Sequence, residues 1–370
     1  MTGKLRIAFS LLAAVVIAGA CSSSGATSAP SGSSLKIGVV TDVGSVTDHT
    51  FNEYSYEGAK AAATALGATI NVAVPADASD YSKDIQSFVD DKYNIIVTVG
   101  FNLGDATITA AKANPNIWFV AVDVAPCVDP TGAPDDTFAC AGDAATLLPK
   151  LIGIQFEEDQ AGYLAGIVAA AVSTSGVIGQ IGGIDNNPAV VRYMQGFQLG
   201  AASYNPNIQV KTAWFSNGDL TKAYGDPVFG KTFSTQFIAQ QGVDVVFQVA
   251  GSTGNGALDA ACAAGIYGIG VDVDEYLTYP SADRCLVTSA EKNVSAAVNQ
   301  TVTAIAGKTA KGGISKFNAA NNGVGYAPLS ENTLVTYPSD LQGKLDTALA
   351  AMKSGTLPTC PAQCGTWSGQ

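Results

Sequence analysis

The chain has 370 residues, of which 47% are hydrophobic and 14% charged, and its formal charge at pH 7 is −12. At about 150 residues per domain this length predicts two or three domains, and the composition excludes a disordered chain or a coiled coil. The acidic balance argues against nucleic acid as a partner, because phosphates select basic surfaces. The single histidine weakens any catalytic or metal site built on imidazole, so we expect neither a metal ion nor a cofactor.

Residues 1–20 have the pattern of a signal peptide. Two basic residues precede an apolar run at 7–20, which is shorter than the roughly 20 residues that span a bilayer. Small residues then lead directly to Cys21, and this resembles a bacterial lipobox, where cleavage precedes a cysteine that receives lipid. Ordinary signal cleavage near Ala20 is the alternative. With residues 21–34 as the lipidated cysteine and a flexible Ser-rich tether, we expect a lipid-anchored protein on the extracytoplasmic face of the cell membrane.

Six cysteines remain after Cys21, an even number that suits disulfides in an oxidising compartment. We expect each cysteine to pair with its neighbour in the sequence, because every such pair closes a short loop. The expected pairs are Cys127–Cys140, Cys262–Cys285 and Cys360–Cys364. A metal site is the weaker alternative, because the chain has no C-x-x-C motif.

From residue 35 onward, apolar runs typical of buried parallel strands alternate with segments of helical periodicity. The predicted strands cover residues 35–42, 94–100, 117–123, 177–182, 208–215, 243–249 and 267–272. The predicted helices cover residues 50–66, 105–113, 156–172, 188–203, 229–241 and 257–264. Thr50 and Glu53 fit a capping box at the start of the first helix. This alternation predicts an α/β fold with mostly parallel sheets, and the number of units favours two lobes.

Polar and small residues recur where the predicted strands end. Asp42, Asp123 and Asp272 each follow or end a strand, and Gly251 and Gly254 lie in the segment after another. Ligands of open α/β sheets bind outside these carboxyl ends, and a carboxylate that accepts two hydrogen bonds suits a vicinal diol such as a sugar. Each aspartate alone is more simply explained as a turn or helix cap, but the recurrence favours a ligand site. The glycines predict close approach of the backbone to that ligand.

Several longer motifs follow one another in order between residues 35 and 340. They include TDVGSVTDHTFNEYSYEG at 41–58, FEEDQAGYLAG at 156–166, GSTGNG at 251–256, GIGVDVD at 268–274 and TSAEK at 288–292. Together they resemble the basic membrane protein family, whose members are lipid-anchored substrate-binding proteins of ABC importers. The best-understood type is a purine nucleoside receptor. The resemblance therefore implies a purine nucleoside or a similar small ligand, and ABC permease and ATPase subunits as partners.

The same resemblance implies the type I periplasmic-binding-protein fold, in which two Rossmann-like lobes are joined by a hinge of three crossovers and bind ligand in the cleft between them. We place the crossings near residues 155, 273 and 312. The implied N-terminal lobe is then 35–155 with 273–312, and the implied C-terminal lobe is 156–272 with 313–370.

By position in the family motifs, Phe51 is implied to stack on one face of a purine base, with Asp42 and Asn52 at the polar edge of the base. Tyr224 is implied to close the other face from the second lobe, with Trp214 or Phe215 as alternatives. The residues implied to hold the ribose are Asp123, Asp272 and Lys292. A core aromatic on a helix is the structural alternative for Phe51, but its place beside a strand end favours the ligand.

Two further functions stay open beside transport. An exported nucleoside-processing enzyme is conceivable because carboxylates would lie near a ribose, but no nucleophile–base pair or metal cluster is recognisable, so we do not expect an enzyme. A ligand sensor or surface adhesion lipoprotein is the other alternative.

Overall fold

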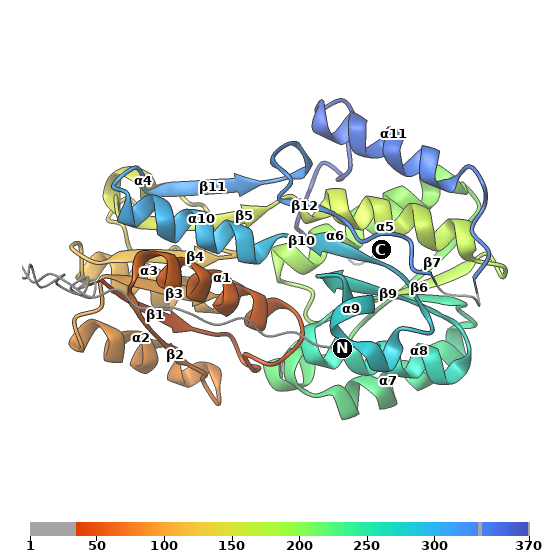
Figure 1. Ribbon diagram of the computed structural model, residues 1–370, viewed down its shortest axis with the longest axis horizontal. Helices are drawn as coiled ribbons and strands as arrows, with labels where there is room; N and C mark the ends of the chain where they lie inside the picture. The colour runs from red at the N-terminus through yellow and green to blue at the C-terminus, as the bar shows by residue number, and fades with distance from the viewer. Residues whose placement is uncertain (1–34, 332–334, 369–370) are drawn as a thin grey trace, which may run out of the picture. The chain divides into compact units, whose positions relative to one another are not determined.

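The computed structural model describes residues 35–331 and 335–368, which belong to one compact unit. The predictions for the signal peptide, Cys21 and the tether concern residues outside these ranges. Two six-stranded sheets, each covered by helices, make up the two lobes (Figure 1).

The strands of the first sheet are β1 (Lys36–Val40), β2 (Thr69–Ala73), β3 (Ile95–Val99), β4 (Trp118–Val122), β5 (Leu151–Phe156) and β11 (Gly313–Phe317). They are all parallel, in the order β11-β5-β4-β3-β1-β2. The strands of the second sheet are β6 (Val177–Gly182), β7 (Gln209–Trp214), β8 (Val245–Val249), β9 (Tyr267–Asp272), β10 (Leu286–Lys292) and β12 (Val324–Tyr326). Their order is β12-β10-β9-β8-β6-β7, and only β12 is antiparallel to its neighbour. The central strands are buried on both faces, as their apolar sequences predict.

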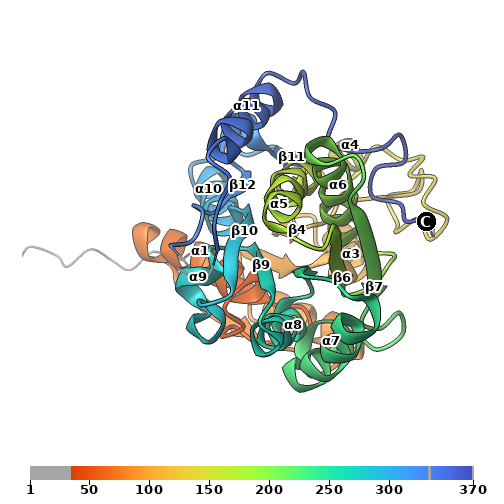
Figure 2. The ribbon, with the colours of Figure 1, turned by 90° about the vertical axis from the view of Figure 1, so that its right-hand side faces the viewer.

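The α-helices are α1 (Phe51–Leu66), α2 (Tyr81–Asp90), α3 (Gly104–Ala113), α4 (Ala144–Leu147), α5 (Glu158–Val172), α6 (Pro188–Tyr204), α7 (Pro227–Gln241), α8 (Gly251–Ala264), α9 (Glu275–Thr278), α10 (Val294–Ala306) and α11 (Leu341–Lys353). Figure 2 shows α5 and α6 on one side of the second sheet and α7 and α8 on the other. The mostly parallel sheets, covered on both faces and divided between two lobes, confirm the predicted α/β type I periplasmic-binding-protein fold.

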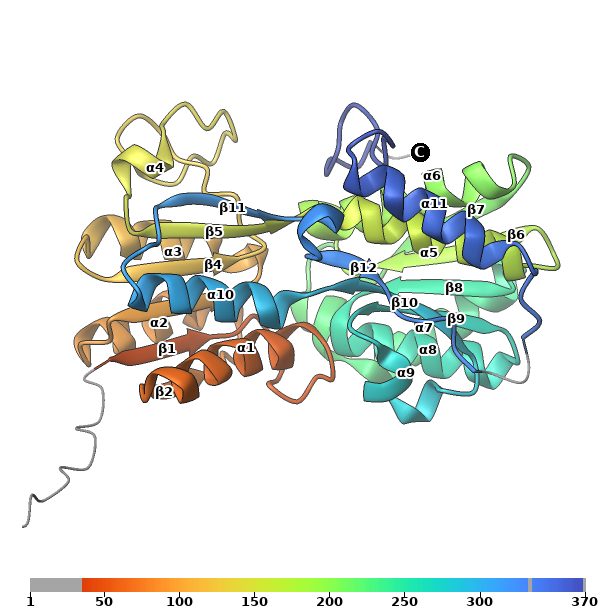
Figure 3. The same cartoon turned by 45° about the horizontal axis from the view of Figure 1, so that its top comes forward.

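Strand pairing corrects two of the predicted lobe limits. Residues 273–312 are predicted for the first lobe, but β10 pairs with β9 in the second sheet. Residues 313–370 are predicted for the second lobe, but β11 pairs with β5 in the first sheet. Within the described residues the chain therefore crosses between lobes after β5, after β10 and after β11, as can be followed in Figure 3. The motifs place the second crossing one strand too early, because only the short helix α9 and a 3₁₀ turn at Pro280–Ala282 separate β9 from β10.

Helices α5 and α6 pack against each other along glycines. A side chain at Gly162 would overlap the backbone of Tyr193, and one at Gly196 would overlap the backbone of Asp159. All residues of α5 except Ala171 are buried, which explains why the helix is mostly apolar on all sides after its first turn. This close contact fixes the first turns of both helices beside the end of β10.

Candidate functional site

A cavity lies between the carboxyl ends of the two sheets. Its lining residues on the first lobe and the hinge include Asp42, Asp48, Phe51, Asn52, Phe101, Asp123 and Lys292, and those on the second lobe include Asn187, Val190, Tyr193, Tyr224, Gly251 and Asp272. Its volume is about 60 Å³, below the roughly 300–1,000 Å³ of small-molecule sites. A ligand larger than a few water molecules therefore enters only if the lobes or side chains move apart.

Lys292, the last residue of β10, is the centre of a buried charge cluster. Its Nζ atom lies 2.6 Å from Oδ2 of Asp123, 3.6 Å from Oδ1 of Asp272 and 3.8 Å from Oε1 of Glu158. The side chain of Lys292 is only 3% exposed. Burial by itself lowers the pKa of Lys292, but the three carboxylates outweigh it and hold the pKa above its ordinary value. The lysine is therefore a fixed cation between the two lobes.

Asp123 and Asp272 occupy equivalent places in the two lobes. Asp123 follows β4 and Asp272 ends β9, and both have left-handed backbone angles, with φ of 61° and 67°. Aspartate tolerates this conformation better than most residues. The left-handed conformation turns the carboxylates of both aspartates toward Lys292. Burial raises the pKa of Asp123 to about 6, against the lowering effect of Lys292.

The cluster extends to residues that the sequence analysis did not select. Glu158, fully buried in the first turn of α5, accepts a hydrogen bond of 2.6 Å from Nε of Arg192 in α6. The hydroxyl of Tyr193 donates to Oδ1 of Asp272 at 3.2 Å. Among the described residues, Oδ1 of Asp123 and Oε1 of Glu158 have no hydrogen-bond donor. Of these two residues Asp123 lines the cavity, so its buried Oδ1 can still accept a hydrogen bond there.

Asp42 and Asn52 meet at the other end of the cavity. Asn52 accepts a hydrogen bond from the backbone N–H of Asp42 at 3.2 Å, and its amide donates to Oδ2 of Asp48 at 3.1 Å. The Asp42 carboxylate accepts hydrogen bonds from the Tyr81 hydroxyl, from a backbone N–H and from the amide of Asn102. Burial raises the pKa of Asp42. Both predicted residues line the cavity, but their polar groups already have partners within the first lobe.

Asp48, rather than Thr50, caps helix α1. Its carboxylate accepts hydrogen bonds from the backbone N–H groups of Thr50, Asn52 and Glu53 at 2.9–3.1 Å. The Thr50 hydroxyl makes no capping hydrogen bond and instead reaches the second lobe, while the Glu53 carboxylate accepts from the N–H of His49. The predicted capping box is therefore wrong, because an aspartate two residues earlier reaches the same donors.

Phe51 and Tyr224 line the cavity from opposite lobes. Nζ of Lys292 lies 4.6 Å from the ring centre of Phe51, within the range of a cation–π contact. Tyr224 lies in a π-helical turn at Thr221–Gly225, and its hydroxyl accepts a hydrogen bond of 3.3 Å from Asn187. The alternatives Trp214 and Phe215 are not among the lining residues: the first contacts Trp367 and the second is buried in the core.

The two predicted glycines differ in their surroundings. Gly251 lines the cavity at the start of α8 and has a left-handed φ of 52°, which favours glycine. Gly254 does not line it: a Cβ there would overlap the side-chain oxygen of Gln248. The missing side chain at Gly254 therefore makes room for Gln248 of the protein itself, and the approach of a ligand to Gly254 stays a prediction.

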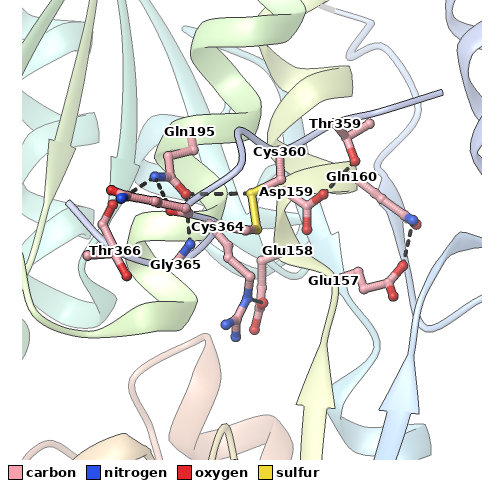
Figure 4. Close-up of a disulfide and its surroundings, with 12 residues drawn as sticks. Glu157, Glu158, Asp159, Gln160, Gln195, Thr359, Cys360, Cys364, Gly365 and Thr366 are labelled. Atoms are coloured by element: carbon pink, nitrogen blue, oxygen red, sulfur yellow. Dashed lines mark hydrogen bonds and ion pairs between the residues drawn. A yellow bond between two sulfur atoms is a disulfide. The ribbon is translucent and has the colours of Figure 1, made fainter. Parts of the chain in front are cut away.

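The three expected cysteine pairs are disulfide-bonded in the structure, at Cys127–Cys140, Cys262–Cys285 and Cys360–Cys364. Figure 4 shows the last pair beside Asp159 in the first turn of α5 and beside Gln195 of α6. The Gln195 amide donates to the backbone oxygen of Gln363, inside the disulfide loop, and to that of Thr366, just after it. Among the described residues, Asp159 and this pair form a grouping of potential metal ligands, but the bonded sulfurs offer no thiolate. None of the described helices has the length and apolar character needed to cross a membrane.

Comparisons with known proteins agree with this architecture. The family model described as ABC transporter substrate-binding protein, PnrA-like, matches residues 35–349. A protein of Lactococcus lactis named ABC transporter nucleoside-binding protein BmpA is 30% identical over 334 residues, covering 85% of this chain and 88% of that protein. Basic membrane protein A of Borreliella burgdorferi is 26% identical over 266 residues, covering 71% of this chain and 70% of that protein.

Among solved structures, an ABC transporter solute-binding protein from Aeropyrum pernix superposes with a TM-score of 0.73 at 21% identity, covering 88% of this chain and 92% of that one. This likeness supports the fold. The family match spans both lobes and includes every residue of the Lys292 cluster. The chain therefore belongs to the PnrA-like family of ABC transporter substrate-binding proteins.

Proposed function

We propose that this protein captures a purine nucleoside, or a closely similar ligand, in the cavity between its lobes and delivers it to an ABC importer. The observation that carries the proposal is the Lys292 cluster beside the Phe51 ring. It places hydrogen-bonding charges and an aromatic face within one cavity. The name of the Lactococcus lactis relative, a nucleoside-binding protein, supports the same ligand class.

The carboxylates around Lys292 suit the ribose. A sugar hydroxyl donates one hydrogen bond and accepts others, so a vicinal diol fits between a lysine donor and carboxylate acceptors. Oδ1 of Asp123 is buried, has no donor among the described residues and belongs to a residue that lines the cavity. We assign the ribose to Asp123, Asp272 and Lys292.

The base fits between the two aromatic residues. A purine has two π faces, and stacking on an aromatic side chain contributes roughly 1–3 kcal/mol per base. Phe51 offers one face from the first lobe and Tyr224 the other from the second, so both contacts form only when the lobes are together. Asp42 is the polar group that lines the cavity near the edge of the base, and a ligand group there would share a hydrogen bond that Asp42 already makes with Tyr81 or Asn102. Asn52 acts mainly by holding the backbone of Asp42.

Titration calorimetry with inosine, adenine and ribose tests the assignment. We expect inosine to bind most tightly, adenine more weakly and ribose most weakly. Phe51→Ala weakens the binding of inosine and adenine alike, whereas Phe138→Ala, which removes an exposed ring outside the cavity, changes neither. Binding of ribose alone, or wild-type affinity in Phe51→Ala, contradicts the purine assignment.

The same titration distinguishes transport from catalysis. A receptor returns inosine intact, so chromatography of the mixture after prolonged incubation shows no hypoxanthine. Release of free base at a rate above that without protein would instead favour the exported enzyme.

Attachment to the membrane through Cys21 is part of the proposal. The apolar run before Cys21 and the Ser-rich tether after it support a lipoprotein signal. We expect labelled palmitate to enter the wild-type protein and not Cys21→Ser, which is released or incompletely processed but still folds. Equal labelling of both proteins contradicts lipidation at Cys21.

A further inference from the structure

Residues 48–50, called here the latch segment, connect the first lobe to two helices of the second. The side-chain amide of Asn255 in α8 donates a hydrogen bond of 3.1 Å to the backbone oxygen of Asp48. The hydroxyl of Thr278 in α9 donates one of 3.1 Å to the backbone oxygen of His49. Two adjacent carbonyl groups of the first lobe are thus held by side chains from two separate elements of the second.

The third residue of the latch segment contacts the end of β9. The Thr50 hydroxyl lies 3.4 Å from the backbone oxygen of Val271 and 3.3 Å from Oδ2 of Asp272. Thr50 is fully buried. Every residue of the latch segment therefore makes a hydrogen bond that crosses between the lobes.

The latch segment is rigidly joined to the first lobe. The Asp48 carboxylate holds the first N–H groups of α1, and the backbone N–H of His49 donates to Glu53 at 2.9 Å. The next residues along the chain, Phe51 and Asn52, line the cavity. Movement of the latch segment relative to the second lobe therefore moves these cavity residues as well.

Asn255 contacts the latch segment but has no role of its own in the cavity between the lobes. Its side chain is 4% exposed, it is not among the residues that line the cavity, and its Oδ1 atom has no partner among the described residues. Within the part of the chain that the structure describes, its one side-chain hydrogen bond goes to the other lobe. A buried amide whose partner lies across the cleft stabilises the closed arrangement of the lobes and loses that partner when they part.

We propose that the latch segment and Asn255 form an inter-lobe latch, with Asn255 as a positioning residue that sets how long the cleft stays closed around its ligand. The inference rests on the proposed ligand binding in the cleft. Because Asn255 does not line the cavity, it acts on affinity only through the population and lifetime of the closed state. Loss of one neutral hydrogen bond corresponds to about a two- to tenfold change in that equilibrium.

The test uses the full chain with Asn255→Ala, and Asn299→Ala as the matched control. The Asn299 amide also donates to a backbone oxygen, that of Gly58, but the contact joins α10 to α1 within the first lobe. We expect Asn255→Ala to speed amide hydrogen exchange at residues 48–50 in ligand-free protein. Inosine should dissociate about two- to tenfold faster in stopped-flow measurements, with an unchanged association rate. Asn299→Ala should change neither quantity.

Wild-type exchange and dissociation rates in Asn255→Ala overturn the latch, as does an effect confined to the association rate. If inosine binds to no variant, including the wild type, the proposed ligand fails, yet hydrogen exchange without ligand still decides the latch. If Asn255→Ala does not fold, Thr278→Val keeps the side-chain shape and removes the bond to His49. It should give a smaller increase in the same two rates.

Discussion

At the Lys292 end of the cavity, carboxylates from Asp123, Asp272 and Glu158 surround one lysine, and Oδ1 of Asp123, which lines the cavity, has no donor among the described residues. At the Asp42 end, the carboxylate of Asp42 and both side-chain groups of Asn52 are hydrogen-bonded within the first lobe. One end of the cavity thus has a buried acceptor without a donor, whereas the polar groups at the other end already have hydrogen-bond partners.

This difference indicates where a ligand gains affinity. A buried carboxylate oxygen without a hydrogen-bond donor destabilises the ligand-free protein, because it has lost its water and gained no partner. A ligand hydroxyl that donates to this oxygen removes that penalty, and hydrogen bonds to charged groups contribute about 1.5–3 kcal/mol. A ligand group that binds at the Asp42 end must share or displace a hydrogen bond that already exists. We therefore expect polar recognition to be strongest around Lys292, and recognition of the base to depend mainly on its aromatic faces.

The largest expected effect comes from removing the central cation. Lys292→Met leaves three buried carboxylates around an apolar side chain, and breaking a buried ion pair by removing one partner costs about 3–5 kcal/mol. Chemical denaturation should show that loss, and inosine binding should become undetectable by calorimetry. Lys344→Met is the control, because its ion pair with Asp340 is exposed and changes stability by at most about 1 kcal/mol. Equal stability of the two variants contradicts the central role of Lys292.

Asp272→Ala should have the next largest effect and should separate the two ends of the cavity. It removes an acceptor for the ribose and leaves the Tyr193 hydroxyl and the Lys292 cation with one partner fewer. We expect the affinity for inosine to fall by about 1.5–3 kcal/mol and the affinity for adenine to stay within error. Calorimetry with both ligands measures the contrast. An equal loss for adenine places the free base, rather than the sugar, at the Lys292 end.

Phe51→Ala should weaken both ligands by about 1–3 kcal/mol, because each loses one stacking face. Phe101→Ala is the informative comparison, since this ring also lines the cavity from the first lobe but is not assigned to stacking. We expect a smaller loss from it for either ligand. The assignment of Phe51 fails if Phe101→Ala has the larger effect.

Most of the central strands can be predicted from the sequence, because each is an apolar run that ends at a polar or small residue. β3 and β8 are buried throughout, so their sequences contain no polar face and predict parallel strands directly. The sequence analysis assigned no element to β2, because this edge strand is half-exposed and mixes Thr and Asn with apolar residues. It also missed β10, whose residues entered only as a family motif. Edge strands and lobe crossings depend on partners that are distant in the sequence.

The residues of the Lys292 cluster were named where a strand end or a family motif pointed to them, and missed where the role of a residue depends on a pair. Asp123, Asp272 and Lys292 were named individually, and the structure brings them together around one ammonium group. Glu158 lies among three successive acidic residues at a helix start, a pattern usually exposed to solvent. Its burial depends on Arg192, 34 residues later, and only the packing of α5 on α6 reveals this pair.

The smallest expected effect is the pH dependence of binding at the Lys292 end. Burial raises the pKa of Asp123 from its ordinary value of 3.8 to about 6, in a setting that also contains Lys292, Glu158 and Asp272. Because the folded protein then holds this proton more tightly than the unfolded chain, the stability contributed by Asp123 is greatest at low pH and declines as pH rises from about 4 to about 6. Ligand binding has the opposite sign, since the ionised carboxylate is the better acceptor for a ribose hydroxyl.

We therefore expect the affinity for inosine to fall by up to about tenfold between pH 7 and pH 5, because at pH 5 only about a tenth of a carboxyl with a pKa near 6 is ionised. Asp123→Asn cannot titrate, so its weaker affinity should be nearly constant over this range, whereas Asp340→Asn, an exposed control, should retain the wild-type slope. Adenine, which makes no ribose contact, should show little pH dependence in any variant. If adenine and inosine follow the same pH curve, or if Asp123→Asn keeps the wild-type slope, the titrating group lies elsewhere in the cavity. Asp42, whose pKa burial also raises, is then the next carboxyl to replace.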